Sequence, residues 1–365
     1  MSHTKALVAE GISKVLAFLK RKAFEEISQS SVKNIFSRSK SLERILKKAI
    51  NKLGYHLSKT ESIRELQKNG AQGTAKFWAV QTFFAALNQS ENFDRVYSLL
   101  GDGPSRETFD WFIRARVALA FLGNRAFDLF PPPVDKQRFE RGIEEIAKKT
   151  KNRKAFIEGF RLKSTLENLF CSFIFQQYRL PELVEPKAGD YVFDIGGCYG
   201  ETSFWFSKSV GRTGKVFCFE PLLENYKILE ENLRANRIEN VVLVKMAVGD
   251  VTGEVRIYGK GGGATISETG SIVPCMTIDE FVSRFQVEKV DMVKMDIEGS
   301  ELKAMKGAAE TLKRFKPKLA ISVYHGGEDC VSIPLFIESL KLGYRIYLRH
   351  FTPSYSETIL FATVA

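Results

Sequence analysis

Cysteine is scarce in this chain, and its placement argues against two classes of protein. Only five of the 365 residues are cysteine, no two of them form a C-x-x-C pair, and their spacing fits no zinc site. Disulfide-dependent secreted domains carry far more cysteine, so we expect reduced thiols and a cytoplasmic protein. Nothing in the sequence demands a metal ion: Asp296 and Glu298 could bind one, but no further ligand cluster is visible beside them.

Long apolar runs and targeting signals are also missing. No stretch reaches the ~18 consecutive apolar residues of a membrane span, and the N-terminus shows no signal-peptide core followed by a small-residue cleavage site. The sequence has no visible internal repeat and no RRM or KH signature of RNA binding. Its length of 365 residues exceeds one average domain and fits a sheet domain with an appended region.

Negative charge is the minority charge, and the imbalance lies in one half of the chain. The net charge is +11; residues 1–180 contain 32 Lys and Arg against 18 Asp and Glu, whereas residues 181–365 contain 22 against 25. Such a field attracts phosphates, acidic glycans, nucleic acid or anionic lipid without choosing among them. We therefore expect any polyanionic partner to meet the N-terminal half.

The N-terminal half is expected to be helical. Two apolar stripes with helical spacing, each accompanied by Lys and Arg, occupy residues 8–19 and 42–53. A basic amphipathic helix either packs its apolar face on the body of the protein or lies on an anionic membrane surface. Residues 1–55 are therefore a candidate for binding a membrane surface or another polyanion, and the protein would then be peripheral to the membrane.

A glycine-rich turn between two predicted strands is the most informative motif. The apolar run Val192–Ile195 predicts a buried strand, and the next one, Lys215–Phe219, ends at Glu220. Between them the pattern is Asp194, Gly196, Gly197 and Gly200. A glycine turn with an acid ending the next strand suits an adenosine ligand. The flanking acids would repel a pyrophosphate but suit ammonium and sulfonium groups, as in S-adenosylmethionine; the alternative is that Asp194 only caps the following helix.

Further strands follow, with helical segments between them. They are predicted at residues 240–245, 254–258, 290–295, 319–324, 344–348 and 358–364. This alternation predicts a parallel sheet with helices on both faces, and ligands of such sheets bind beyond the carboxyl ends of the strands. Because Pro131–Pro133 breaks the earlier helical pattern, we expect a basic, mainly helical region at residues 1–165 and the sheet domain at residues 166–365.

A series of short motifs in the second half occurs in the order found in one enzyme family. They are Asp194-x-Gly196 with Gly200, Phe219-Glu220-Pro221, Asn232 and Asn236, Ala247-Val248-Gly249-Asp250, Thr277-Ile278-Asp279, Lys294-Met295-Asp296-Ile297-Glu298-Gly299-Ser300-Glu301 and Lys316-Pro317. With them, residues from about 176 to the C-terminus resemble the FkbM-type family of S-adenosylmethionine-dependent methyltransferases. The resemblance implies a class I, Rossmann-like fold with a seven-stranded, mostly parallel sheet. Where the family often has Ala-Asn, this chain has Gly197-Cys198, so one side-chain hydrogen bond to the cofactor is expected to be missing.

Carried over residue by residue, the resemblance also implies a cofactor site. The turn Gly196–Gly200 would lie against the methionine part of S-adenosylmethionine, and Glu220 would hold the ribose hydroxyls through charge-assisted hydrogen bonds. Met246 and Ala247 would lie beside the adenine, although ordinary core packing is the alternative for Met246. Asp296 would sit near the sulfonium, where the methyl group is transferred.

For methyl transfer to a hydroxyl, three side chains at neighbouring strand ends are candidate catalytic residues: Asp296, Glu298 and His325. His325 has an ordinary pKa near 6.5 and lies beside two glycines, so it is the first candidate for the base; the alternative is a loop histidine bonded to backbone. Glu298 and Glu301 open a predicted helix, so stabilising its positive end is their alternative role, preferred for Glu301. Lys294 is expected to pair with a neighbouring acid.

The predicted activity is S-adenosylmethionine-dependent O-methylation of a hydroxyl on a sugar, a glycan precursor or a secondary metabolite. This substrate class comes from the family resemblance alone. One alternative is RNA methylation, which the basic half would suit. Another is a scaffold without catalysis that binds a membrane or polyanion through residues 1–55.

Overall fold

The computed structural model describes residues 2–27 and 75–364, which fall into two compact units. Unit 1 comprises Met1–Ser98, Arg106–Pro133 and Gly326–Glu328, and unit 2 comprises Leu99–Ser105, Val134–His325 and Asp329–Ala365. Every motif shared with the methyltransferase family therefore lies in unit 2. Among the described helices, none is both long and apolar enough to cross a membrane.

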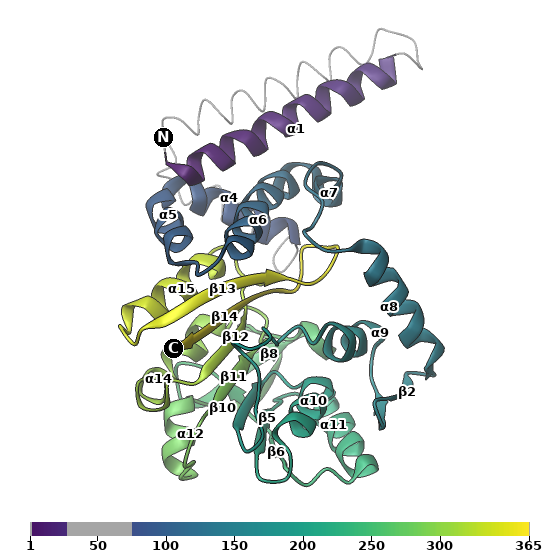
Figure 1. Cartoon of the computed structure of the whole chain (residues 1–365), viewed down its shortest axis with the longest axis vertical. Coiled ribbons are helices and arrows are strands. Elements are labelled where there is room, and N and C mark those ends of the chain that lie inside the picture. Colours follow the sequence, from purple (N-terminus) through teal and green to yellow (C-terminus); the bar gives the residue numbers. More distant parts are fainter. Residues whose placement is uncertain (1, 28–74, 365) are drawn as a thin grey trace. The chain divides into compact units, whose positions relative to one another are not determined.

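The described part of unit 1 is helical (Figure 1). Its helices are α1 (His3–Ile27), α4 (Ala75–Asn88), α5 (Ser90–Leu99), α6 (Gly103–Leu122), η1 (Gly123–Arg125) and α7 (Ala126–Leu129). The backbone N–H of Thr4 donates to Asp94 at 2.8 Å, which fixes the start of α1 on α5. Val8 and Val15 of the first predicted stripe are buried, so this stripe packs within the protein. The second stripe, residues 42–53, lies outside the described residues, and polyanion binding through residues 1–55 stays a prediction.

A seven-stranded sheet forms the centre of unit 2. Its strands, in spatial order, are β13 (Tyr344–His350), β14 (Thr358–Val364), β12 (Lys318–Ser322), β11 (Met292–Met295), β4 (Tyr191–Ile195), β5 (Lys215–Phe219) and β6 (Val241–Val244). β14 runs antiparallel to β12 and β13, and the other neighbouring pairs are parallel. From β4 the chain builds outward to β6 and then returns to the other side of β4 with β11. The order in which strands are added to the sheet therefore reverses between the parallel strands β4 and β11, which is where ligands bind in sheets of this kind.

Helices cover both faces of this sheet (Figure 1). They are α10 (Glu201–Val210), α11 (Leu223–Asn236), α12 (Ile278–Arg284), α13 (Glu301–Lys306), α14 (Ala309–Phe315) and α15 (Asp329–Ser339). Successive residues of β4 point to opposite faces: Val192 belongs to a buried cluster with Phe204 of α10, whereas the Phe193 ring contacts Phe281 of α12 with centroids 5.8 Å apart. Because both faces are packed, the end of β4 is held firmly in place.

Residues 134–165 belong to the same unit as the sheet, so the division falls earlier than the predicted boundary at 165. They include α8 (Lys136–Lys148) and a small antiparallel sheet of β1 (Thr150–Lys151), β2 (Lys154–Ile157) and β3 (Phe160–Lys163), which we call the hairpin. Helix α9 (Leu166–Phe170) follows it. Asn236 of α11 accepts the N–H of Arg161 and donates to its carbonyl, both at 2.8 Å. Asn232 does the same for Lys163 at 2.9 and 3.1 Å. These amide pairs attach the hairpin to the sheet domain and explain the earlier division.

A separate four-stranded sheet follows β6 in the chain. Its order is β7 (Ala247–Val248), β10 (Ser271–Met276), β8 (Gly253–Tyr258) and β9 (Thr265–Ile266). β8 confirms the strand predicted at residues 254–258, and the other predicted strands are confirmed as β6, β11, β12, β13 and β14. Strands β7, β9 and β10 were not predicted from the sequence, because they are short or interrupted by polar residues and Pro274.

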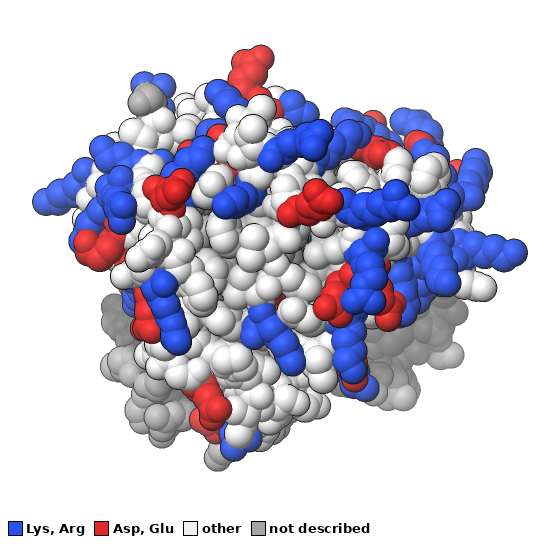
Figure 2. All heavy atoms as spheres, turned by 90° about the horizontal axis from the view of Figure 1, so that it is seen from below, with Lys and Arg blue, Asp and Glu red and all other residues white. Residues whose placement is uncertain are grey.

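Positive charge is not confined to the helical unit. Lys and Arg outnumber Asp and Glu on the face shown in Figure 2. In unit 2, exposed basic side chains are concentrated on α8 and the hairpin: Lys136, Arg138, Arg141, Lys148, Lys149, Lys151, Arg153, Lys154 and Arg161. Part of the charge that the sequence analysis assigned to an N-terminal region therefore lies on the sheet unit.

Candidate active site

The glycine loop, residues 196–200, joins β4 to α10 and is shaped by the neighbouring strand ends. Gly196 (φ +85°) and Gly200 (φ +98°) have left-handed backbone conformations, which glycine adopts at little cost. A Cβ atom at Gly196 would overlap the backbone oxygen of Asp296, and one at Gly197 would overlap the sulfur of Cys218. The packing of the loop between β11 and β5 thus requires these glycines before any ligand is considered.

A buried ion pair anchors the glycine loop. Nζ of Lys294 lies 3.0 Å from Oδ1 of Asp194, and both side chains are almost completely buried, at 2% and 0% exposure. Thr202 and Ser203, in the first turn of α10, each donate to Oδ2 of Asp194 at 2.6 Å. Lys294 also donates to the carbonyl of Gly196 at 2.8 Å. Lys294 is therefore paired with an acid, as expected, and both oxygens of Asp194, a predicted cofactor residue, are already engaged within the protein.

The candidates for holding an adenosine lie at the next two strand ends. Glu220 follows β5, is 4% exposed, and accepts the backbone N–H groups of Cys198 and Leu222 at 3.0 and 2.8 Å. Burial raises the pKa of Glu220 to about 7, although these two hydrogen bonds oppose the shift. Met246 is half-buried just beyond β6, and Ala247, which begins β7, is buried. All three lie on the side of β4 away from β11.

The acidic edge lies at the carboxyl ends of β11 and β12 and consists of Asp296, Glu298, Glu301 and His325. Oδ2 of Asp296 accepts a hydrogen bond from the Tyr178 hydroxyl at 2.7 Å, and Oδ1 lies 3.5 Å from Nε2 of His325. Burial alone would raise the pKa of Asp296, but the positive charges of His325 and Lys294 outweigh it and lower that pKa. Asp296 is therefore ionised at neutral pH.

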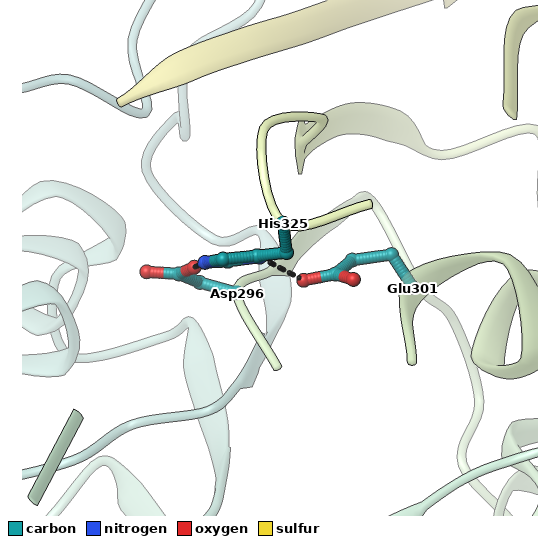
Figure 3. A group of neighbouring side chains, drawn as sticks. All are labelled: Asp296, Glu301 and His325. Atoms are coloured by element: carbon teal, nitrogen blue, oxygen red, sulfur yellow. Dashed lines mark hydrogen bonds and ion pairs between the residues drawn. The ribbon is translucent and has the colours of Figure 1, made fainter. Parts of the chain in front are cut away.

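Glu301 orients the imidazole of His325. Nδ1 of His325 lies 2.8 Å from Oε1 of Glu301, and Figure 3 shows the ring between Glu301 and Asp296. Glu301 is fully buried at the start of α13 and also accepts two backbone N–H groups of the preceding turn at 2.9 Å each. On the Nε2 side, Oε2 of Glu298 lies 3.5 Å from the ring nitrogen. Glu301 therefore supports the helix start, its preferred alternative role, and fixes the histidine as well.

His325 does not have the ordinary pKa near 6.5 that made it the first candidate for the base. Burial alone would lower its pKa, but the charges of Glu301 and Glu298 outweigh burial and raise it to about 10. The expectation from the sequence is wrong because chain order does not show that three carboxylates surround the ring. At neutral pH both ring nitrogens carry a proton, so the imidazolium cannot accept another.

Four polar residues beside the acidic edge were not predicted from the sequence. The Tyr324 hydroxyl donates to Oε1 of Glu357 at 2.9 Å, and Gln177 donates to Oε2 at 2.8 Å. Burial, followed by the charge of Asp296, raises the pKa of Glu357 to about 8. Tyr178, which binds Asp296, comes from the segment before β4. Only Tyr324 had a local signal, since it directly precedes His325.

The glycine loop and the acidic edge meet at the carboxyl ends of the neighbouring parallel strands β4 and β11. Lys294 reaches from β11 to the loop, and the backbone N–H of Asp296 donates to the carbonyl of Ile195 at 3.0 Å. The structure thus brings Asp296, Glu298 and His325 together and places them beside the loop. This arrangement offers a cationic ligand several carboxylates at one edge of the sheet.

Comparisons with known proteins bear on the family and the fold. Residues 194–346 match the family model described as "Methyltransferase FkbM domain". The hexuronic acid methyltransferase AglP of Haloferax volcanii is 27% identical over 170 residues, which cover 45% of this chain and 68% of that protein. The crystal structure of Methyltransferase FkbM from Methylobacillus flagellatus KT is similar in fold, with a TM-score of 0.52 and 21% identity over 76% of this chain. The match spans 59% of that crystallised chain.

Proposed function

Residues 194–346 form an FkbM methyltransferase domain, and on this premise we propose that the chain transfers a methyl group from S-adenosylmethionine to a hydroxyl of a sugar, a glycan precursor or a secondary metabolite. The observation that carries the proposal is that the glycine loop and the acidic edge lie side by side at the carboxyl ends of the neighbouring strands β4 and β11. A sugar acceptor is favoured because the relative from Haloferax volcanii is named as a hexuronic acid methyltransferase. The exposed basic side chains of α8 and the hairpin would suit RNA methylation or a polyanion-binding scaffold, but they do not select either.

The residues beside the glycine loop fit S-adenosylmethionine. A carboxylate offers about four lone-pair sites; each oxygen of Glu220 accepts one backbone N–H, so sites remain for ribose hydroxyls. Met246 and Ala247 would lie along the adenine, and the backbone of residues 196–200 along the methionine part. When bound, the cofactor supplies an activated methyl group. The chain's main task is then to place the acceptor, and positioning can supply about 7–11 kcal/mol of a barrier.

Asp296 and Glu298 are the groups that would touch the acceptor. Their side chains are 25% and 22% exposed, whereas the side chain of His325 is 1% exposed with carboxylates at both ring nitrogens. The two carboxylates would orient the hydroxyl and take up its proton as the methyl group arrives. His325 would act through them as a positioning residue, because its ion pairs hold both acids near one point.

The test is methyl transfer by the full chain to matched acceptors. Purified protein is incubated with S-adenosylmethionine and either a hexuronic acid oligosaccharide or its neutral counterpart, and products are followed by mass spectrometry. An alkali-stable ether would support O-methylation of a hydroxyl, whereas an alkali-labile ester would place the methyl group on a carboxylate and overturn that part. Asp296→Ala should reduce turnover by about 10²–10⁴-fold. Glu254→Ala, which removes an exposed acid of β8, is the matched control and should leave turnover unchanged.

A further inference from the structure

Two carboxylates of the acidic edge, Asp296 and Glu298, flank the same ring nitrogen of His325. Nε2 of His325 lies 3.5 Å from Oδ1 of Asp296 and 3.5 Å from Oε2 of Glu298, both longer than the 2.8 Å contact between Nδ1 and Glu301. Nitrogen and oxygen ligands at about 2.0–2.2 Å from a shared metal ion lie roughly 3 Å apart in adjacent positions. Each of the two nitrogen–oxygen separations exceeds this value by about 0.5 Å, so both carboxylates would approach the ring nitrogen on binding an ion.

The other ring nitrogen has the partner that metal-binding histidines need. Such histidines almost always donate their second N–H to a carboxylate or carbonyl, which fixes the tautomer and the ring orientation. Glu301 fills this role, since it is fully buried and lies 2.8 Å from Nδ1. Asp296, Glu301 and His325 offer ligand atoms within 4.8 Å of one another. The ring lies between the two carboxylates, however (Figure 3), so Glu301 can orient the ring while Asp296 can share an ion with Nε2.

The charges of the acidic edge also favour a cation. Three carboxylates surround one imidazole, and the nearby Lys294 is already engaged with Asp194 at 3.0 Å. Buried charges persist in proteins when they are paired or coordinate metals. When all three carboxylates are ionised, a divalent ion beside a neutral imidazole leaves one surplus negative charge in the edge, whereas an imidazolium alone leaves two; burial raises the pKa of Glu298 to about 7, and a bound cation would favour its ionised form.

We propose that Asp296, Glu298 and Nε2 of His325 bind a divalent first-row metal ion, with Glu301 orienting the ring. One imidazole and two carboxylates suit Mn²⁺ or Zn²⁺, because imidazole ligation favours Zn²⁺ and carboxylates favour Mn²⁺. Binding displaces the ring proton from Nε2 to solvent. The remaining coordination positions would take water or the acceptor hydroxyl, whose pKa the ion would lower, so that its proton passes more readily to a carboxylate of the acidic edge. This role in the reaction rests on the proposed function, whereas metal binding itself does not.

The test measures metal binding without cofactor or acceptor. Full-length protein is stripped with chelator, dialysed, and titrated with Mn²⁺ or Zn²⁺ by calorimetry. We expect one saturable site per chain, with affinity reduced at least about tenfold in Glu298→Gln and His325→Gln, and about 10–100-fold in Glu301→Gln. Glu357→Gln is the matched control, because Tyr324 and Gln177 bind the oxygens of that buried acid. It should keep the wild-type affinity.

A second variant and a second measurement distinguish a loss of metal binding from a failure to fold. If His325→Gln does not fold, Glu298→Gln decides, because that side chain is partly exposed; metal should raise the thermal midpoint of wild type and not of this variant. The absence of a saturable site, or affinities unchanged in both variants, overturns the proposal and leaves an ion-pair network. Methyl transfer that fails with metal bound would count against the proposed function alone. Transfer that survives chelation would remove the ion from the reaction.

Discussion

The glycine loop and the acidic edge are neighbours on one sheet, but they balance buried charge in opposite ways. Beside the loop, Asp194 meets Lys294 at 3.0 Å and two hydroxyl groups at 2.6 Å, so charge and hydrogen bonds are matched within the chain. At the acidic edge, three carboxylates share the single ring of His325. Removing one partner of a matched buried ion pair leaves the other charge uncompensated and destabilises the fold. Carboxylates in excess over their cationic partners can instead bind a cationic ligand. We infer that the loop anchor is structural and the acidic edge is the reactive side.

The largest expected effect comes from removing one acid on each side. Asp194→Asn should lower the free energy of unfolding by about 3–5 kcal/mol, because it leaves Lys294 buried without its counter-ion. Asp296→Asn removes one of several competing carboxylates and should change stability by less than about 1 kcal/mol. Urea unfolding of both variants in the presence of chelator measures the difference. Equal losses would contradict the contrast between the two regions.

Glu220 tests whether the loop side holds the adenosine. Glu220→Ala should weaken the binding of S-adenosylmethionine and of its demethylated product by about 1.5–3 kcal/mol, the range for hydrogen bonds to charged groups. Calorimetry of wild type and variant gives the difference. Glu224→Ala, an exposed acid four residues further on in α11, serves as the control. Unchanged affinity in Glu220→Ala would remove Glu220 from the site, and tight binding of NAD instead would overturn the cofactor assignment.

The strands and the loop could be predicted because their signals are local. Val192–Ile195 is a short apolar run that stops at glycines, and the structure places β4 and its turn there. The positions of β11 and β12 follow from similar runs. Their polar ends therefore also identified Asp296 and His325 as neighbours at one edge, since parallel strands of a sheet end together.

The electrostatics of the site could not be predicted in the same way. The pKa of His325 depends on Glu301 and Glu298, which lie on another segment of the chain, and nothing in the sequence shows how deeply the ring is buried. Glu357 and Tyr178 come from segments far apart in the chain and reach Asp296 only through tertiary packing. The hairpin at residues 150–163 was missed for a related reason, because the asparagines that hold it are in α11.

Replacing glycine by alanine should lower stability for different reasons in the glycine loop and beside the acidic edge. Gly197→Ala places a methyl group against the sulfur of Cys218 and should cost about 1–3 kcal/mol of stability, as overpacking does. Adding Cys218→Ala makes room and should recover part of that loss. Gly299, which lies between Glu298 and Glu301, has room for a Cβ atom, whose nearest neighbour would be Cβ of His325 at 3.9 Å, but its φ is +95°; Gly299→Ala should therefore cost about 1–2 kcal/mol with no rescue from a neighbour. Thermal or urea unfolding of the single and double variants tests both; an additive double variant would mean that Cys218 is not the obstacle.

The smallest expected effect is a pH dependence of cofactor binding that arises at Glu220. Burial raises the pKa of Glu220 to about 7 in the free protein, so its carboxyl group is protonated below that pH and ionised above it. An ionised acceptor binds ribose hydroxyls more strongly than a neutral one. Cofactor affinity should therefore fall as the pH drops from 8 to 6, by at most about tenfold per unit. Calorimetry with wild type and Glu220→Gln measures this, because the amide keeps the shape and does not titrate in this range. A slope of the same size in Glu220→Gln would assign the titration to the cofactor or to another residue, and Glu220 would then bind without changing its charge.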